Sequence, residues 1–531
     1  MSPPSTVGRY VVELLAANGI DVVFGIPGVH TLELYRGLAL TGMRHVLVRH
    51  EQNAGFAADG FARVSGRPAA AFVISGPGVT NALTAVAQAY TDSVPLIVVA
   101  SAPVRASLGK GWGVLHELPD QLALGAGVTG LARHASSAED VRDHLRALFA
   151  SFRAGRPRPA YLQIPLDLLA EPTELRAERF APVSARPQPA QQEIDRATAA
   201  LAAAKRPLVI AGGGARAAGA ALLRLIEILD GYLISTTAGK GCLPEAHPAN
   251  LGASLPFRDM QELVAAADVI VAVGTELAET DFYTGTRLPM SGRLIRIDID
   301  PAKLADQYGA EFPLWGDARA CLEAIAAGLE KRQGWRTAAG AAASHRTKIE
   351  KSFDGRARAR LHAVKAIREG VPAEGVVFSD QTQIAYLGNY AYAADRPESW
   401  FHPCGYGALG FALPAALGAK IAQPGRPVIA LAGDFGLQFT LQELMTAVEL
   451  ELSLPVVVWN NEALGQIRDD MQAAGIPPVG VIARNPDFVA LARAFGAQGV
   501  RAAGQAELTR ALRQALERHG PTLIEALETD F

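Results

Sequence analysis

A carboxylate and two carboxamides follow two apolar segments near the C-terminus of the chain. Asp434 comes directly after the run PVIALAG at 427–433, and Asn460 and Asn461 come directly after LPVVVW at 454–459. If both runs are parallel strands of one sheet, these side chains meet beyond the strand ends. Hard oxygen ligands in such a place suit Mg²⁺ holding a diphosphate. The alternative is that Asp434 only caps a helix and Asn461 only sits in a turn.

The residues between the two runs predict how this site is positioned. Gly433 and Gly436 stand on either side of Asp434 and let the backbone turn tightly. The segment TLQELMTAVEL at 440–450 carries apolar residues at helical spacing. We therefore expect a strand, a helix and a second strand in succession.

Apolar runs alternate with helical segments along all 531 residues. A chain of this length suggests about three domains. We expect an α/β fold of three domains, each with a mostly parallel sheet flanked by helices, at residues 1–177, 190–340 and 355–531. The Pro-rich stretch 178–193 is predicted to be a linker. A charged helical stretch, 345–367, leads into the third domain.

The composition excludes several classes of protein. Hydrophobic residues make up 49% and charged residues 19%, which indicates a globular chain rather than a disordered one. The net charge of -3 disfavours a nucleic-acid partner. No apolar run is long enough for a membrane helix, and the N-terminus lacks the pattern of a signal peptide. Three scattered cysteines form no metal cluster and suit a reducing cytoplasm, where we expect the protein.

The stretch GDFGLQFTLQELMTAVELELSLPVVVWNN at 433–461 resembles the binding signature of the thiamine-diphosphate enzymes. Phe435 departs from it, because the family has a third glycine there. Two further segments resemble the same family: VRHEQNAGFAADGFARVSGRP at 48–68 and FHPCGYGALGFALPAALGAK at 401–420. Together they imply a pyrimidine-binding, a central and a diphosphate-binding domain, of the acetolactate synthase-like type.

The resemblance implies thiamine diphosphate and Mg²⁺ as cofactors, with a role for each matched residue. Glu51 would share a proton with the pyrimidine ring, and burial there would raise its pKa. Leu409 would bend the cofactor, and the Gly407 carbonyl would accept from its amino group. The implied metal ligands are Asp434, the Asn461 side chain and the Ala463 carbonyl. The full implied cofactor set is Glu51, Gln381, Thr382, Gly407, Leu409, Gly433, Asp434, Phe435, Gly436 and Asn461.

Local differences from related enzymes narrow the set of reactions that this chain could catalyse. His116 lies where acetolactate synthases carry a Gln-Glu pair and pyruvate decarboxylases a His pair, so it is either a proton relay or a structural histidine. Ile467 replaces an acid of the simple pyruvate decarboxylases. The run VGTELAETDFYTG at 273–285 lacks the arginines of acetolactate synthases and carries acids instead. The segments 25–38, 115–121 and 460–471 look like the 5-guanidino-2-oxopentanoate (2-ketoarginine) decarboxylase group.

These resemblances imply a decarboxylase that converts a 2-oxo acid to CO₂ and an aldehyde. The alternatives are an acetolactate synthase-like carboligase and, least favoured, an inactive scaffold of the same fold. The predicted substrate-contacting residues are Gly28, His30, Gln88, His116, Glu279 and Asp281. Acids that could bind a guanidinium tail are Glu117, Asp120, Glu279, Asp281, Asp469 and Asp470.

The partners that the resemblance implies are a small-molecule 2-oxo acid and a second copy of the chain. The active sites of the family lie between subunits, so a homodimer or homotetramer is expected, and no nucleic acid or membrane partner. The glycine cluster AGGGARAAG at 211–219 could approach a nucleotide phosphate, such as that of FAD. A central domain without a ligand is the favoured interpretation.

Overall fold

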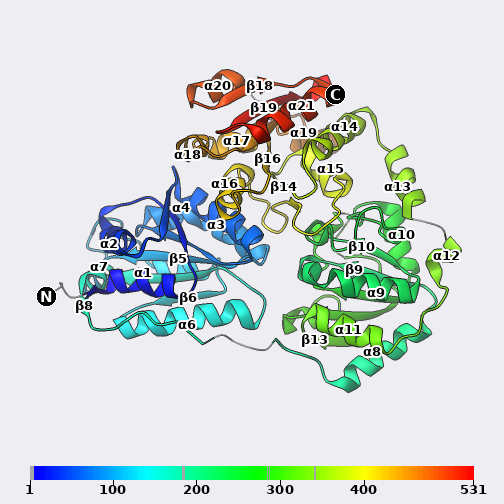
Figure 1. The fold of residues 1–531 in the computed structure, drawn as a ribbon, viewed down its shortest axis with the longest axis horizontal. Helices are drawn as coiled ribbons and strands as arrows, with labels where there is room; N and C mark the ends of the chain where they lie inside the picture. The colour runs from blue at the N-terminus through cyan, green and yellow to red at the C-terminus, as the bar shows by residue number, and fades with distance from the viewer. Residues whose placement is uncertain (1–4, 182–185, 284, 286, 340–341, 483) are drawn as a thin grey trace.

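Three parallel sheets, one after another along the chain, organise the molecule (Figure 1). The structure is a computed structural model that describes residues 5–181, 186–283, 285, 287–339, 342–482 and 484–531. It confirms the expected α/β fold, with three domains that each have a parallel sheet flanked by helices. The proposed domain boundaries stay a prediction, and their end points at 1 and 340 lie outside the described residues. The same holds for residues 182–185 of the linker.

The N-terminal sheet has six parallel strands in the order β3-β2-β4-β5-β7-β6. Its strands are β2 (Val22–Gly25), β3 (Arg44–Leu47), β4 (Ala69–Val73), β5 (Leu96–Ala102), β6 (Leu131–His134) and β7 (Ala160–Pro165). Its helices are α1 (Val7–Ala17), α2 (Leu32–Thr41), α3 (Glu51–Ser65), α4 (Pro77–Thr91), α5 (Gln121–Ala126), α6 (Ala138–Ala154) and α7 (Leu166–Ala170). A short antiparallel pair, β1 (Ser5–Thr6) and β8 (Pro172–Thr173), joins the two ends of this domain.

The central sheet has five parallel strands in the order β10-β9-β11-β12-β13. Its strands are β9 (Pro207–Ala211), β10 (Tyr232–Ser235), β11 (Val269–Val273), β12 (Arg293–Asp298) and β13 (Phe312–Trp315). Its helices are α8 (Gln191–Ala203), α9 (Gly219–Leu229), α10 (Arg258–Ala266) and α11 (Ala318–Ala327). Two further helices, α12 (Trp335–Ala339) and α13 (Ala342–Lys351), lead to the third domain.

The C-terminal sheet has six parallel strands in the order β15-β14-β16-β17-β19-β18. Its strands are β14 (Val376–Ser379), β15 (Trp400–Phe401), β16 (Val428–Gly433), β17 (Pro455–Asn460), β18 (Gln498–Arg501) and β19 (Thr522–Leu527). Its helices are α14 (Gly355–Gly370), α15 (Gln383–Ala391), α16 (Ala412–Ala422), α17 (Asp434–Thr440), α18 (Glu443–Glu449), α19 (Gly465–Ala473), α20 (Phe488–Ala494) and α21 (Gly504–Glu517).

The N-terminal and C-terminal sheets share one topology. When the six strands of each are numbered along the chain, both follow the order 2-1-3-4-6-5. In both sheets the strand order reverses between the first and third strands, and such a reversal opens a crevice beyond the carboxyl ends of the strands. Inner strands such as β5, β16 and β17 are buried along their whole length, which explains why they appear in the sequence as continuous apolar runs.

Helices α3 and α16 join these two domains through very close backbone contact (Figure 1). A Cβ atom at Gly60 would stand 1.9 Å from the carbonyl oxygen of Ala415. A Cβ atom at Gly418 would stand 1.9 Å from the carbonyl oxygen of Ala57. Only glycine allows the two helix backbones to approach this closely.

The segment 440–450 differs from the single helix that its periodicity predicts. It contains the end of α17 and the whole of α18, with Leu441 and Gln442 between them. Both of these residues keep helical backbone angles, and Leu444 N–H donates to the Leu441 carbonyl. The break is therefore one tightened turn rather than a change of direction.

Candidate active site

The start of α17 places a buried carboxylate at the carboxyl end of β16. Asp434 is the first residue of the helix and is 2% exposed. One of its oxygens accepts from its neighbour Phe435 N–H at 3.0 Å, and the other accepts from Asn485 Nδ2 at 2.7 Å. Phe435 lies inside the helix and does not have a positive φ, so the backbone does not require the family's glycine there.

The two asparagines after β17 differ in what they bind. Asn460 donates to Glu525 at 2.8 Å and accepts from Asn485 at 3.0 Å, so its amide is committed to the fold. Asn461 is partly buried, and its Oδ1 accepts a long bond, 3.3 Å, from Ala463 N–H. One carboxylate, the Asn461 oxygen and the nearby Ala463 carbonyl therefore fit Mg²⁺ in chemistry. No group of three His, Cys, Asp or Glu side chains that could hold a metal occurs among the described residues.

Asp380, which no sequence motif predicted as a site residue, links the loop after β14 to the loop before α16. It is buried after β14 and accepts from Gly410 N–H at 2.9 Å and from Gln381 N–H at 2.8 Å. Burial, opposed by these hydrogen bonds, raises the pKa of Asp380 to about 6. Its only signal in the sequence was its position just before Gln381.

Two glycines allow the loop after β14 to approach α17. A Cβ at Gly433 would lie 2.9 Å from Thr382 Oγ1, and one at Gly436 would lie 2.8 Å from an Asp380 oxygen. Gln381 donates to the Pro403 carbonyl at 2.6 Å. The predicted diphosphate residues therefore share one small region at the ends of β14 and β16.

The loop before α16 exposes the residues that are predicted to touch the cofactor rings. Gly407 has a φ of +71° and is exposed, which leaves its carbonyl accessible. Leu409 is partly buried beside it. Gln88, a predicted substrate residue of the N-terminal domain, contacts this loop. Its Oε1 accepts from Ala408 N–H at 3.0 Å. Its Nε2 donates to Asp92 at 2.8 Å, so both ends of this amide are engaged.

Glu51 begins α3, beyond the end of β3 in the N-terminal domain. It is partly buried within one chain, and its Oε2 accepts from Asn81 Nδ2 at 2.9 Å. The rest of α3 is buried from Asn53 to Val64, as the run of small apolar residues after Glu51 indicated. Glu51 therefore stands at the partly buried start of an otherwise buried helix.

The loops after β2 and β5 bring together two predicted substrate residues, His30 and His116. Their ring centroids are 4.8 Å apart in an edge-to-face arrangement. Nδ1 of His30 shares a hydrogen bond with Ser75 Oγ at 2.6 Å. Burial, and then the neighbouring His116, lower the pKa of His30. Gly28 precedes this cluster and packs against Ile74.

Most of the acids considered for a cationic tail already have partners. Glu117 accepts from two glycine N–H groups of its own loop, and Asp120 caps α5. Asp469 accepts from Gln383 and pairs with Arg468 at 3.0 Å. Asp470 is exposed and accepts from Gln466. Glu279 is exposed at the surface.

Asp281 is the exception among these acids. It is partly buried, and no Lys, Arg or His side chain of the described residues forms an ion pair with it. Burial, and then the charges of Glu276 and Asp92, raise the pKa of Asp281 to about 7 against a hydrogen bond from the Ala278 backbone. Glu276 differs, because Arg156 at 2.6 Å and Lys303 at 2.8 Å neutralise it.

Asp281 also lies near the loop that carries Gly407 and Leu409. Its charge is among the causes that raise the pKa of Cys404, after burial and Asp92. The pKa of Tyr283 is raised by burial and then by Cys404, Tyr386 and Asp281. Asp281 of the central domain, which has no ion-pair partner among the described residues, therefore lies near Cys404 at the start of the predicted cofactor loop.

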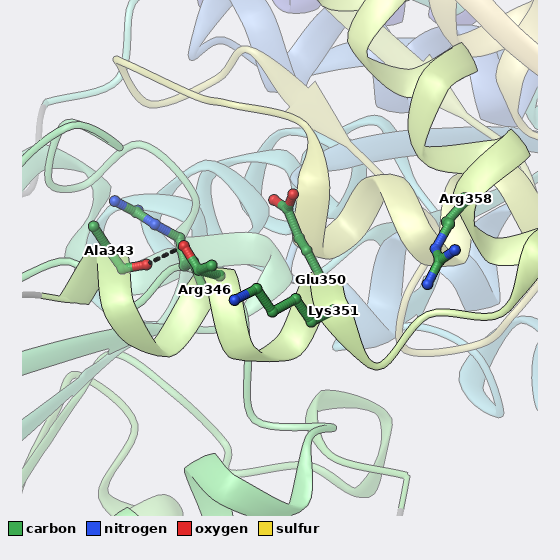
Figure 2. Close-up of a pocket in the computed structure, with 6 residues that line it drawn as sticks. Ala343, Arg346, Glu350, Lys351 and Arg358 are labelled. Carbon is green, nitrogen blue, oxygen red and sulfur yellow. Dashed lines mark hydrogen bonds between the residues drawn. The ribbon is translucent and has the colours of Figure 1, made fainter.

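A surface hollow of about 520 Å³ lies elsewhere, beside α13 and the start of α14 (Figure 2). Figure 2 shows that Arg346, Lys351 and Arg358 point in different directions around it. Arg346 is held by two backbone carbonyls, and Glu350 pairs with Lys365 at 3.3 Å. None of the predicted site residues lines this hollow.

The glycine cluster of the central domain packs against protein backbone. Cβ atoms at Gly212 and Gly214 would lie 2.3 Å and 2.8 Å from atoms of Gly274. Arg216 donates to the Ala238 carbonyl and places its guanidinium over the Phe401 ring of the C-terminal domain. Contacts between loops thus account for the close approach at these glycines.

Comparisons with known proteins identify the family of all three domains. Family models of the thiamine pyrophosphate enzymes match residues 5–124 (N-terminal TPP-binding domain), 194–325 (central domain) and 380–526 (C-terminal TPP-binding domain). A probable 2-ketoarginine decarboxylase of Pseudomonas aeruginosa is 50% identical over 525 residues, covering 98% of this chain and 93% of the relative.

More distant relatives include acetolactate synthases. The isozyme 3 large subunit of Escherichia coli is 34% identical over 532 residues, covering 96% of this chain and 92% of the relative. A probable large subunit of Methanocaldococcus jannaschii is 29% identical, covering 97% and 90%. Three successive domain matches and near-complete coverage by relatives show that this chain belongs to the thiamine pyrophosphate enzyme family.

Proposed function

We propose that this enzyme decarboxylates a 2-oxo acid with a guanidinium tail, 5-guanidino-2-oxopentanoate, and releases CO₂ and an aldehyde. The observation that supports this most is the 50% identity, over nearly the whole chain, to a probable 2-ketoarginine decarboxylase. A physical reason is that Asp281, near the cofactor loop, has no ion-pair partner in the described part of the chain. A guanidinium desolvated in a pocket needs such a carboxylate.

The chain's own residues would hold the cofactor and move protons. Asp434, Asn461 and the Ala463 carbonyl would bind Mg²⁺, and the loops at Gln381, Thr382, Gly433 and Gly436 would surround the diphosphate. Leu409 would support the bent cofactor, and Gly407 would accept from its amino group. Bound thiamine diphosphate supplies the nucleophilic carbon and the electron sink for loss of CO₂.

Glu51 would hold the proton that the pyrimidine ring exchanges during activation. The pair His30 and His116, with Ser75, would deliver a proton to the product. Asp281 would accept the guanidinium of the substrate tail. These roles use three separate strand-end regions of the fold, one in each of the three domains.

We also propose a homodimer or homotetramer in which each active site is shared between two subunits. Within one chain, the residues flanking Glu51 donate to Glu443 of α18. Large apolar side chains are exposed near both halves of the site, Val29, Trp112 and Leu115 in the N-terminal domain and Tyr406 and Phe439 in the C-terminal domain. Exposed apolar clusters of this kind mark interaction surfaces.

The proposed location is the cytoplasm, because Cys242, Cys321 and Cys404 are unpaired. No helix of the described residues could cross a membrane. FAD is not part of the proposal.

A competition between matched substrates tests the proposal. The guanidino acid is compared with its ureido analogue, which has nearly the same shape and no charge, and with pyruvate. We expect kcat/KM for the guanidino acid to exceed both by about 10–100-fold, the value of one or two charge-assisted hydrogen bonds. Equal rates would overturn the choice of substrate and leave the decarboxylase assignment intact.

Carboligation is the second candidate, because the acetolactate synthases are relatives along the whole chain. Product analysis separates the two reactions. Decarboxylation gives CO₂ and an aldehyde, whereas carboligation gives CO₂ and a hydroxyketone. An inactive scaffold would give neither product, and it would not permit hydrogen exchange at the thiazolium carbon of added thiamine diphosphate.

A further inference from the structure

Glu443 of the C-terminal domain has a buried carboxyl group that accepts hydrogen bonds from the N-terminal domain. It begins α18 and is 0% exposed. Its Oε1 accepts from the backbone N–H of Arg49 at 2.7 Å and from Asn53 Nδ2 at 2.8 Å. Its Oε2 accepts from Thr446 Oγ1 at 2.7 Å. Both of its oxygens are therefore engaged.

The two donors from the N-terminal domain stand on either side of Glu51 in the chain. Arg49 lies in the link between β3 and α3, and Asn53 lies in the first turn of α3. A single carboxylate oxygen thus fixes the backbone before Glu51 and a side chain after it. These two bonds hold the chain on both sides of Glu51, whose own Oε2 accepts from Asn81.

Other contacts from α18 strengthen the same link. Arg49 Nη1 donates to Thr446 Oγ1 at 3.3 Å, and Arg49 Nη2 pairs with Glu449 at 2.8 Å. The Glu449 pair lies at the rim, where ion pairs contribute little. Glu443 is the buried member of the set, so it carries most of the positional constraint.

Burial of a carboxyl group at this place lowers the stability of the fold. Burial raises the pKa of Glu443, against the hydrogen bonds from Thr446, Arg49 and Asn53. An apolar side chain of similar size would fill the domain interface without that desolvation. What the carboxyl adds is two directed acceptor contacts to the segment that carries Glu51.

We propose that Glu443 is a positioning residue that sets the direction of the Glu51 carboxylate through Arg49 and Asn53. The inference rests on the proposed role of Glu51 in cofactor activation. Because α18 follows α17, the helix that begins at the metal ligand Asp434, one continuous segment connects the metal site of a chain to its Glu51.

The test compares Glu443→Met, which fills the space without an acceptor, with Glu443→Gln, which keeps one oxygen for Arg49 and Asn53. Both are measured as holoenzymes for hydrogen exchange at the thiazolium carbon, amide exchange at Arg49 and thiamine diphosphate affinity. We expect Met to speed amide exchange at Arg49 and to slow cofactor exchange by about 10–100-fold, the cost of a misplaced group. Cofactor affinity should change less than twofold, and Gln should restore most of the exchange rate.

Matched variants make the outcomes distinct. Glu449→Gln removes only the rim pair and should behave as wild type. Wild-type cofactor exchange in Glu443→Met would overturn the positioning role, provided that Glu51→Gln slows it. Wild-type exchange in Glu51→Gln would overturn the proposed role of Glu51 and the inference with it. If Glu443→Met does not fold, Asn53→Ala removes one of the two bonds, and a wild-type exchange rate in that variant would overturn the inference.

Discussion

The imidazole rings of His30 and His116 meet edge to face, with centroids 4.8 Å apart and planes inclined at 68°. Burial, and then the neighbouring His116, lower the pKa of His30. Nδ1 of His116 is buried without a hydrogen-bond partner among the described residues, whereas Nδ1 of His30 is bound to Ser75. The arrangement suits a proton that moves between ring and substrate.

Replacing His116 should slow release of the aldehyde. General acid catalysis typically contributes ~10²–10⁴-fold, so we expect His116→Gln to lower kcat by that order while thiamine diphosphate affinity stays the same. His45→Gln is a matched control, since His45 also meets an aromatic ring edge to face, Tyr35 at 5.0 Å. A kcat of wild-type size in His116→Gln would assign this histidine to structure alone.

Asp281 should make substrate binding depend on pH. Its pKa is raised from 3.8 to about 7, so the free enzyme carries an extra proton there between about pH 4 and pH 7. A guanidinium favours the ionised carboxylate, so binding releases that proton below about pH 7. We expect KM for the guanidino acid to fall as the pH rises through about 7, and this trend to vanish in Asp281→Asn.

The raised pKa of Asp281 also predicts how the stability of the fold changes with pH. The folded state binds more protons than the unfolded state between about pH 4 and pH 7, so the contribution of Asp281 to stability falls as the pH rises through this range. The groups that face it are Glu276, Asp92, Tyr283 and Cys404. Asp281→Asn should therefore raise Tm more at pH 8 than at pH 4. An equal shift at both pH values would show that the carboxyl titrates normally.

The sequence predicted the strands around the site well, because buried parallel strands are continuous apolar runs. PVIALAG and LPVVVW became β16 and β17 with shifts of one residue. The sequence did not predict a role for Asp380, Asn485 or Glu443, because their roles depend on contacts between distant parts of the chain. Glu443 and Arg49, for example, are 394 positions apart. Local patterns carry no information on such pairs until the domains are placed.

The same limit applied to the six acids, among which the sequence favoured Glu279 and Asp281 without separating these two. Only the structure shows that Asp469 has amide and arginine partners, whereas Asp281 has no cation among the described residues. The break after α17 also escaped prediction. Leu441 and Gln442 fit a continuous helical period, and tightening of one turn does not alter that period.

We expect that any side chain added where the backbones of α3 and α16 lie closest will destabilise the fold. We expect Gly60→Ala and Gly418→Ala each to lower the free energy of unfolding by at least the ~1–3 kcal/mol of ordinary overpacking, because the added Cβ meets backbone that cannot move aside. Gly355→Ala is the control, since nothing lies within 4 Å of a Cβ there. Denaturant unfolding measures all three, and equal stabilities would contradict the close crossing.

Active sites shared between subunits predict complementation between two inactive variants. In a mixed dimer of Glu51→Gln and Asp434→Ala, one site receives both substitutions and the other receives neither. Random pairing should therefore restore about a quarter of wild-type activity in a dimer of twofold symmetry. Co-expression with two affinity tags isolates the mixed dimer. No recovery of activity would mean that Glu51 and Asp434 of one chain serve the same site.

The carboxylate of Asp434 should control binding of the metal and cofactor. Asp434→Asn keeps the shape and can still accept from Asn485 Nδ2, which lies 2.7 Å from the carboxylate, but it removes the charge and one of the two acceptor oxygens. Asn485→Ala leaves the charge and removes the group that orients it. Loss of such an orienting partner typically costs ~10–100-fold in metal affinity, and loss of the charged ligand should cost more. We therefore expect Mg²⁺-dependent thiamine diphosphate affinity to fall in the order wild type, Asn485→Ala, Asp434→Asn, as measured by calorimetry, with Asp487→Asn at the cap of α20 as a control near wild type. Unchanged affinity in Asp434→Asn would remove this residue from the metal site.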